Sequence, residues 1–213
     1  MHSIVSNFEK IKKLVNNNKI NIIAVSKTFN NDHIKPLLDY GHNHFGENKI
    51  QEATSKWSAI KYKFPNLNLH MIGKLQSNKA KDAISLFDYI HSLDSVKLAN
   101  LLAKFEKSLS LKRKYFIQIN IGNENQKSGI KIEQVDEFYN YCKKTLQLNI
   151  IGLMAIPPVD SNASKYFKLL MELNNSLGLI ELSMGMSADF KEALKYNTTF
   201  IRIGSAIFGK RHQ

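Results

Sequence analysis

Short apolar runs rich in β-branched and aromatic residues alternate with longer amphipathic stretches along the whole chain. This alternation is typical of repeated strand–helix units around a parallel sheet. It predicts a first helix over residues 3–16, followed by strands over residues 20–26, 44–45, 68–72, 89–92, 115–120, 150–155, 180–183 and 200–203. Eight strands are the number that a closed (β/α)8 barrel requires.

Apolar residues at three- and four-residue spacing mark the helices between these strands, most clearly over residues 96–105 and 167–173. The chain has 213 residues, whereas a typical barrel has about 250, so the loops must be short and no room remains for a second domain. We therefore predict one α/β domain over residues 1–213, a single (β/α)8 TIM barrel. An open doubly wound sheet is the alternative architecture.

Composition places the chain among globular proteins, because 43% of its residues are hydrophobic and 23% are charged, which excludes wholesale disorder. No stretch approaches the roughly 18 uninterrupted apolar residues of a membrane helix, and the first residues form no secretory apolar core. We therefore expect a cytoplasmic protein with no membrane partner. A single cysteine, Cys142, excludes an intramolecular disulfide framework, and we expect it to be buried packing.

The net charge of +12 is large enough to suggest an anionic partner such as a nucleic acid. The excess is mostly lysine, however, and it is scattered over predicted helix surfaces and loops without a recognised nucleic-acid motif. We expect no dedicated nucleic-acid surface, and we keep a basic nucleic-acid-binding barrel as an alternative.

One lysine stands where a barrel carries its chemistry, at the C-terminal end of a strand. The first predicted strand ends in AVSKT, residues 24–28, so Lys27 follows a buried run directly. Partial burial lowers the pKa of an amine and favours the neutral form, which attacks a carbonyl to form a Schiff base. The alternative is a surface lysine whose stem packs on apolar groups while its ammonium reaches water.

The last two predicted strands end in small and hydroxyl residues, SMGMS over 183–187 and RIGS over 202–205. Loops after strands seven and eight form the usual phosphate site of such barrels, where backbone N–H groups meet the anion. Ser187 has a second interpretation as the N-cap of the next helix, with Asp189 in its first turn.

A Schiff-base lysine and a phosphate site together define a ligand with an aldehyde at one end and a phosphate at the other. Pyridoxal 5′-phosphate (PLP) fits this description. Arg202 stays protonated and can only donate hydrogen bonds, so facing the pyridine nitrogen it would keep that nitrogen unprotonated and the ring a weaker electron sink.

An ordered series of motifs carries a resemblance to a known family: AVSKT (24–28), FGEN (45–48), HMIG followed by LQSNK (70–73 and 75–79), GLM (152–154), LSMGMS (182–187) and IRIG (201–204). These segments closely resemble the signatures of the pyridoxal phosphate homeostasis proteins, and the resemblance spans almost the whole chain. It also extends to the N-terminal barrel domain of bacterial alanine racemases, without their second domain.

The resemblance implies a fold like the alanine racemase N-terminal domain and a protein that buffers PLP or delivers it to apo-enzymes, without robust turnover. It implies that Lys27 carries PLP as an N6-pyridoxal phosphate lysine. Ser183, Gly204 and Ser205 would hold the phosphate, and Arg202 would face the ring nitrogen. The chain departs from the family at Phe29 and Asn30, where a proline is common nearby, and at Leu69, where an aromatic residue is frequent.

Other motif residues can either line the pocket or satisfy buried polar groups of the rim. For His70, a hydrogen-bonded structural role is the commoner outcome, and Glu47 is similarly open. Gly129, in a loop that also resembles the family, is expected to allow a turn before a helix that starts near Ile132. The remaining candidates for ligand contact are Asn48, Gln76, Asn78, Asn120, Lys127 and Met154.

Two further functions remain open from the residues alone. A PLP-dependent amino-acid racemase needs an acid/base group on each face of the substrate α-carbon, and in alanine racemases the second group comes from the domain missing here. An aldolase would use Lys27 directly on a phosphorylated sugar and would be colourless. No metal site is expected, and the oligomeric state is open, with a monomer favoured.

Overall fold

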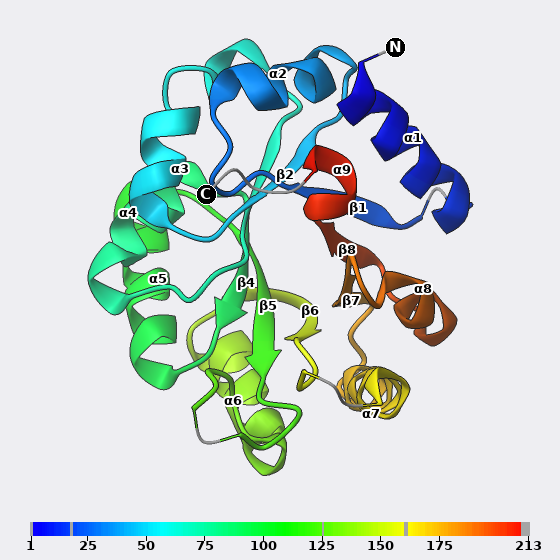
Figure 1. Ribbon diagram of the computed structural model, residues 1–213. Helices are drawn as coiled ribbons and strands as arrows, with labels where there is room; N and C mark the ends of the chain where they lie inside the picture. Colours follow the sequence, from blue (N-terminus) through cyan, green and yellow to red (C-terminus); the bar gives the residue numbers. More distant parts are fainter. Residues whose placement is uncertain (1, 18, 125, 160–161, 210–213) are drawn as a thin grey trace.

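Parallel strands close into a barrel in the computed structural model (Figure 1), which describes residues 2–17, 19–124, 126–159 and 162–209. The strands follow one another around the barrel in sequence order, and the last pairs with the first. They are β1 (Asn21–Val25), β2 (His44–Glu47), β3 (Asn68–Met71), β4 (Tyr89–Leu93), β5 (Lys114–Ile119), β6 (Asn149–Ala155), β7 (Glu181–Met186) and β8 (Phe200–Ile203). The predicted (β/α)8 barrel is confirmed, and the open sheet is excluded.

Helices alternate with the strands and surround them. They are α1 (Ser3–Val15), α2 (Asn31–Asp39), α3 (Ile50–Trp57), α4 (Ala80–Leu86), α5 (Val96–Leu109), α6 (Val135–Asn140), α7 (Ala163–Ser176), α8 (Phe190–Ala193) and α9 (Ser205–Phe208). Short 3₁₀ turns and one π-helical turn over Tyr141–Thr145 complete the order. None of the helices in the described ranges is long and apolar enough to cross a membrane.

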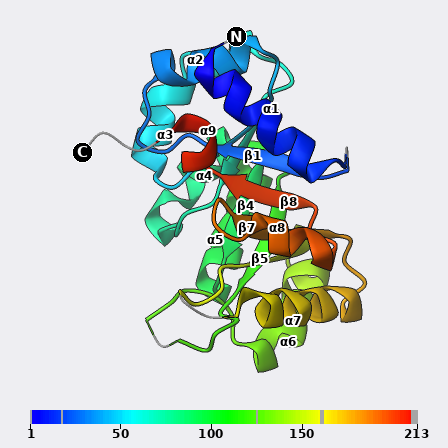
Figure 2. The same cartoon turned by 45° about the vertical axis from the view of Figure 1, so that its right-hand side comes forward.

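The first and last helices lie side by side, as Figures 1 and 2 both show. The side-chain amide of Asn7 in α1 donates to the backbone carbonyl of Ile207 in α9, at 3.2 Å. Strand β1 also pairs with β8. The N- and C-terminal parts of the described chain are therefore in contact both through these strands and through helices α1 and α9.

Alternation along each strand separates two layers of apolar packing. Inside the barrel, Ile23, Tyr89, Phe116, Met154 and Phe200 form one cluster. A larger cluster fills the space between the strands and the surrounding helices. Cys142 is fully buried in this outer layer, where burial raises the pKa of its thiol to about 12, so the expected packing role is confirmed.

Two strands end at least two residues later than their sequence patterns predict, and each continues through a glycine. β2 extends past Gly46, where a Cβ would lie 2.7 Å from Ile23 Cγ2 and only glycine fits the barrel interior. β7 extends past Gly185, which has φ +92° where the pairing with β8 shifts register. A glycine inside a strand commonly marks such a bulge.

The longer β7 changes the interpretation of the residues that follow it. Ser187 lies in a turn and is not a helix N-cap. Helix α8 begins at Phe190, and Asp189 is its N-cap residue, although the Asp189 carboxylate makes no capping bond and instead accepts from the Met186 amide at 2.6 Å.

Candidate functional site

Three of the candidate residues follow neighbouring strands at the C-terminal end of the barrel. Lys27 lies in the turn after β1, Asn48 follows β2 and Gly204 follows β8. Strand β1 pairs with both β2 and β8, so these three positions are adjacent around the rim. A Cβ on Gly204 would lie 3.5 Å from the Val25 carbonyl oxygen, which brings the β8 loop next to the end of β1.

Strand alternation indicates which of these residues face the barrel interior. Ile23 points inside, so Val25, the last residue of β1, also faces the interior, and Lys27 lies in the turn just beyond it. Asn48 is half-buried, and its side-chain oxygen is buried without a hydrogen-bond partner in the described part of the chain. An unpartnered buried acceptor at the rim suits contact with a ligand that carries a donor.

Arg202 is a charged group in the barrel interior, and only 4% of it is exposed. Its Nη1 donates to Ser183 Oγ at 2.7 Å and its Nη2 donates to the Ala155 carbonyl at 3.0 Å. Burial lowers the pKa of the guanidinium to about 10, so it is charged at neutral pH. No carboxylate forms an ion pair with it among residues 2–17, 19–124, 126–159 and 162–209.

Two consequences follow for the chemistry at Arg202. The charge of Asp189 acts on Arg202 and partly offsets its burial, but a buried cation without a carboxylate in ion-pair contact is costly, so the site favours a ligand that offers an acceptor or negative charge. A guanidinium has five N–H donors and no acceptor, so it has capacity beyond its two contacts and cannot take a proton from a ligand.

Ser183 lies deeper than expected from the sequence. Because β7 continues to Met186, Ser183 is a mid-strand residue, fully buried, and its Oγ lies between Arg202 and His91 Nδ1, which is 2.9 Å away. Its predicted contact with phosphate stays a prediction, and its position favours a role in orienting Arg202. Ser205, by contrast, is exposed at the start of α9.

His70 and Met154 both lie inside the barrel and are fully buried. His70 Nε2 lies 2.9 Å from His44 Nδ1, and His70 Nδ1 lies 3.0 Å from His91 Nε2. Both ring nitrogens of His70 are therefore hydrogen-bonded to other histidines. This is the structural role that the sequence left open for His70. Met154 packs in the inner apolar cluster.

The loop after β5 holds two further candidates in contacts of its own. The Asn120 side chain donates to the Glu124 carbonyl at 2.9 Å and accepts from the Glu124 amide at 3.0 Å. Lys127 forms an ion pair with Glu124 at 2.6 Å. Gly129 has φ +130°, and a Cβ there would lie 2.4 Å from the Asn120 amide nitrogen, so the expected turn is confirmed. It leads into a 3₁₀ turn over Ile132–Gln134 and then α6.

The two candidates that follow β3, Gln76 and Asn78, are exposed.

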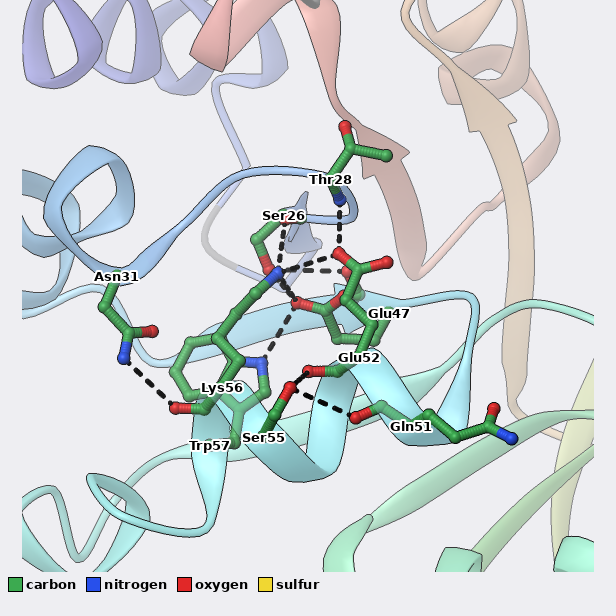
Figure 3. Close-up of polar contacts among 10 residues, drawn as sticks. Ser26, Thr28, Asn31, Glu47, Gln51, Glu52, Ser55, Lys56 and Trp57 are labelled. Atoms are coloured by element: carbon green, nitrogen blue, oxygen red, sulfur yellow. Dashed lines mark hydrogen bonds and ion pairs between the residues drawn. The ribbon is translucent and has the colours of Figure 1, made fainter.

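A buried charged cluster, formed by Glu47, Glu52 and Lys56, was not assembled by sequence reasoning (Figure 3). Lys56 Nζ lies 2.8 Å from Glu47 Oε1 and 3.2 Å from Glu52 Oε1, and it donates to the Ser26 carbonyl at 2.8 Å. The same Glu47 oxygen accepts from Trp57 Nε1 at 3.0 Å and from Ser26 Oγ at 2.7 Å. Glu47 is therefore a partner of α3, on the outside of the strands.

This cluster holds the backbone on both sides of Lys27. Lys56 bonds to the carbonyl of Ser26, and the carboxylate of Glu52 accepts from the amide of Thr28. Thr28 has φ +70°, a left-handed conformation that is unfavourable for a β-branched residue. Helix α3 thus determines the course of the turn that carries Lys27. The four-residue spacing of Glu52 and Lys56 was the available sequence signal.

Asp94 is a second residue that sequence reasoning missed. It directly follows β4 at the C-terminal rim, where burial raises the pKa of its carboxyl, opposed by the charge of Lys74 and by hydrogen bonds from Ser95 and Ser128. A carboxyl with a raised pKa beside a barrel mouth is a candidate proton donor or acceptor.

Comparison with known proteins gives a consistent result. Residues 1–212 match the family described as alanine racemase, N-terminal domain. The pyridoxal phosphate homeostasis protein of Aquifex aeolicus is 35% identical over 199 residues, which cover 89% of this chain and 86% of that protein. The protein of the same name from Buchnera aphidicola subsp. Schizaphis graminum is 37% identical and is covered over 98% of each chain.

Two solved structures extend the comparison. PipY of Synechococcus elongatus PCC7942, solved with PLP bound, superposes with a TM-score of 0.89 at 31% identity, covering 97% of this chain and 100% of that chain. Alanine racemase of Clostridium difficile 630 superposes with a TM-score of 0.77 at 17% identity, covering 99% of this chain and 57% of that chain. The second similarity concerns the fold alone.

Proposed function

Because the chain belongs to the alanine racemase N-terminal domain family and, within it, to the pyridoxal phosphate homeostasis proteins, we propose that it binds PLP and buffers or delivers it. The observation that carries this proposal is the buried Arg202, a donor-only cation without a carboxylate partner in the described residues, one strand away from the turn of Lys27. A ligand with an acceptor nitrogen and negative charge matches it.

The residues present fit PLP in their chemistry. Lys27 supplies an amine at the rim, Asn48 an unpartnered buried acceptor, and Arg202 a fixed donor. Gly204 carries no side chain, and a Cβ there would lie 3.5 Å from the Val25 carbonyl oxygen at the end of β1; together with Ser205 it offers amide and hydroxyl donors for phosphate. Bound PLP supplies a reactive aldehyde on a heteroaromatic ring.

Lys27 is the residue that we assign to covalent attachment. When PLP is bound, the Lys27 amine would hold the aldehyde carbon through a C=N bond, with the aldehyde oxygen released as water. The link is reversible by the same steps, which suits a protein that stores and releases its ligand. Glu52 and Lys56 bond to the backbone of Thr28 and Ser26, on either side of Lys27. These contacts position the Lys27 backbone, from which its amine extends.

Arg202 favours storage over transformation. It can only donate hydrogen bonds, so if it faced the ring nitrogen of bound PLP it would leave that nitrogen unprotonated and the ring would withdraw electrons less strongly. The racemase alternative gains one observation, the partly buried Asp94 with its raised carboxyl pKa at the same rim, which would supply one of the two required acid/base groups.

The finer parts of the proposal concern place and partners. We propose that the chain acts in the cytoplasm, as a monomer, and that its recipients are PLP-requiring apo-enzymes. Mixing the PLP-loaded protein with an apo-enzyme and following the recovery of that enzyme's activity tests delivery. Recovery no faster than with an equal concentration of free PLP would contradict it.

The deciding experiment is the visible absorption spectrum after PLP is added and the excess removed, for the natural sequence and for Lys27→Ala. Lys35→Ala is the matched control, because Lys35 is an exposed lysine paired with Asp39 on α2 and reports non-specific attachment. We expect a yellow band that requires Lys27 and not Lys35. An equal band in all three proteins, or in none, would overturn the assignment of Lys27.

The same samples separate buffering from racemisation. After loading, L-alanine is added and its chirality is followed by polarimetry. Unchanged chirality supports buffering, whereas conversion that is lost in Asp94→Asn would make the racemase alternative the better function.

A further inference from the structure

A continuous line of hydrogen bonds crosses the barrel interior from the start of β2 to β8. His44 Nδ1 lies 2.9 Å from His70 Nε2, and His70 Nδ1 lies 3.0 Å from His91 Nε2. His91 Nδ1 lies 2.9 Å from Ser183 Oγ, which in turn lies 2.7 Å from Arg202 Nη1. The residues come from five different strands, so only the closed barrel brings them together.

None of the three imidazoles in this line is charged at neutral pH. Burial lowers the pKa of His44 to about 4, with a further lowering by Lys114 that Asp88 opposes. Burial lowers the pKa of His70 and of His91 well below the ordinary value, and the charge of Arg202 acts on His91 in the same direction. Each ring therefore has one N–H donor and one lone-pair acceptor.

The charge and chemistry of Arg202 determine the direction of the whole line. A guanidinium can only donate, so Ser183 Oγ accepts from it. The Ser183 hydroxyl then donates to His91 Nδ1, His91 Nε2–H donates to His70 Nδ1, and His70 Nε2–H donates to His44 Nδ1. The opposite direction would give Ser183 two donors and leave its own hydrogen without an acceptor in the described residues.

Aromatic rings hold two of the histidines in place. Tyr89 stacks on His70 at a centroid distance of 4.4 Å and an interplanar angle of 17°, and Phe116 stacks on His91 at 4.2 Å and 19°. A stacked and fully buried imidazole cannot rotate out of its plane without losing this packing, so the donors and acceptors of the line keep their directions.

We propose that His44, His70 and His91 are positioning residues that act through Ser183 to aim Arg202 at the bound ligand. Without His91, the Ser183 hydroxyl has no fixed acceptor and turns freely, and Arg202 loses the oriented lone pair that holds its Nη1. The inference rests on the proposed function, because PLP is the ligand toward which Arg202 is aimed.

The first test needs no ligand. Imidazole ¹⁵N chemical shifts of the natural protein at pH 7 report which ring nitrogen carries the proton. We expect Nε2–H in His44, His70 and His91, and a change at His91 in Ser183→Ala. Nδ1–H in His91 of the natural protein would reverse the line and overturn the proposal.

The second test compares paired variants of similar size that differ in hydrogen bonding. Ser183→Thr keeps the hydroxyl that Ser183→Val lacks, and His91→Gln keeps a donor and an acceptor that His91→Leu lacks. We expect PLP to bind about tenfold more weakly to the Val and Leu variants than to their Thr and Gln partners. We also expect the pH midpoint of the visible spectrum to shift only in the Val and Leu variants.

Ile23→Val is the control for packing alone, because Ile23 lies in the inner cluster without a polar contact to the line. It should leave the affinity and the pH midpoint unchanged. If the Thr and Val variants behave alike while the natural protein binds PLP, the inference is wrong and the proposed function stands. If the natural protein binds no PLP, the proposed function is wrong and the ¹⁵N shifts alone decide the direction of the line.

Discussion

Lys56 Nζ donates to the backbone carbonyl of Ser26 at 2.8 Å, one residue before Lys27. This contact joins α3 to the end of β1 through a buried ammonium whose charge is balanced by Glu47 and Glu52. A residue of the helix layer thereby sets the position of a residue at the barrel rim, and its removal should affect both stability and binding.

Lys56→Met retains the length of the side chain and removes the charge. Glu47 is then buried without its partner, so we expect the free energy of unfolding to fall by about 3 kcal/mol and PLP affinity to fall with it. Urea unfolding and PLP titration measure the two effects. Lys35→Met breaks an exposed pair with Asp39 and should cost less than about 1 kcal/mol. Equal losses in both variants would contradict a special role for Lys56.

Thr28→Asn should stabilise the protein. Thr28 has φ +70°, and asparagine tolerates the left-handed region better than a β-branched residue does. We expect a gain of about 1 kcal/mol in the free energy of unfolding, measured by urea denaturation. Thr28→Val keeps the branching and should show no gain. A loss in Thr28→Asn would mean that the threonine side chain has contacts that outweigh the backbone strain.

Acid should destabilise the fold through its buried, neutral histidines. His42, with a pKa lowered by burial to about 3, and His44, with a pKa near 4, bind protons in the unfolded chain near pH 6.5 and not in the folded one. The stability that these two histidines contribute by staying neutral is complete above pH 6.5. It is lost as the pH falls from 6.5 toward their pKa values in the folded protein. We expect the free energy of unfolding to decrease by more than about 1 kcal/mol per pH unit below pH 6.

The matched variant for this prediction is His44→Gln, measured by urea unfolding from pH 7.5 to 5. It removes one titrating group. The unfolding free energy should therefore change less steeply with pH between pH 6 and 5, by about 1 kcal/mol per pH unit. A flat stability curve for the natural protein over that range would show that these histidines are not buried in the neutral form.

Gly185→Ala and Gly41→Ala form a matched pair, because both glycines have φ +92°. A Cβ on Gly185 would lie 2.8 Å from the Cβ of Ala193, whereas a Cβ on Gly41 would meet nothing within 4 Å. Backbone strain should cost each variant about 1 kcal/mol, and overpacking should cost Gly185→Ala about 1–3 kcal/mol more. Thermal and urea unfolding give the difference, and equal losses would contradict the close packing of β7 on α8.

Sequence periodicity predicted the order and type of the elements, and β8 was predicted at its observed bounds. The errors at β2 and β7 arose at Gly46 and Gly185, because a glycine at a strand end and a glycine inside a crowded barrel look the same in one sequence. The error at β7 also affected the predicted position of a site residue, Ser183. It placed Ser183 at the mouth, whereas the structure places it in mid-strand beside Arg202.

The long-range contacts of the site were beyond prediction from one sequence. His70 was noticed, but its neighbours His44 and His91 lie on other strands, and only barrel closure defines their distances. The pairing of Glu47 with Lys56 depends on how α3 packs against β2. Lys27, by contrast, was predicted at the barrel rim because it follows a recognisable strand, and Arg202 was predicted at the end of the last strand, although its burial in the barrel interior was not.

The pairing of β1 with β8, which closes the barrel, has a consequence for the synthesis of the protein. The Asn21 side chain bonds to the Thr199 carbonyl, 178 positions further along the chain, so this pairing forms only when the last strand is available. During synthesis the ribosome therefore releases Lys27 well before Arg202. Under the proposed function, a nascent chain therefore displays the amine long before it has the group that recognises the ring, and selective capture of the vitamin-derived aldehyde becomes a property of completed molecules only.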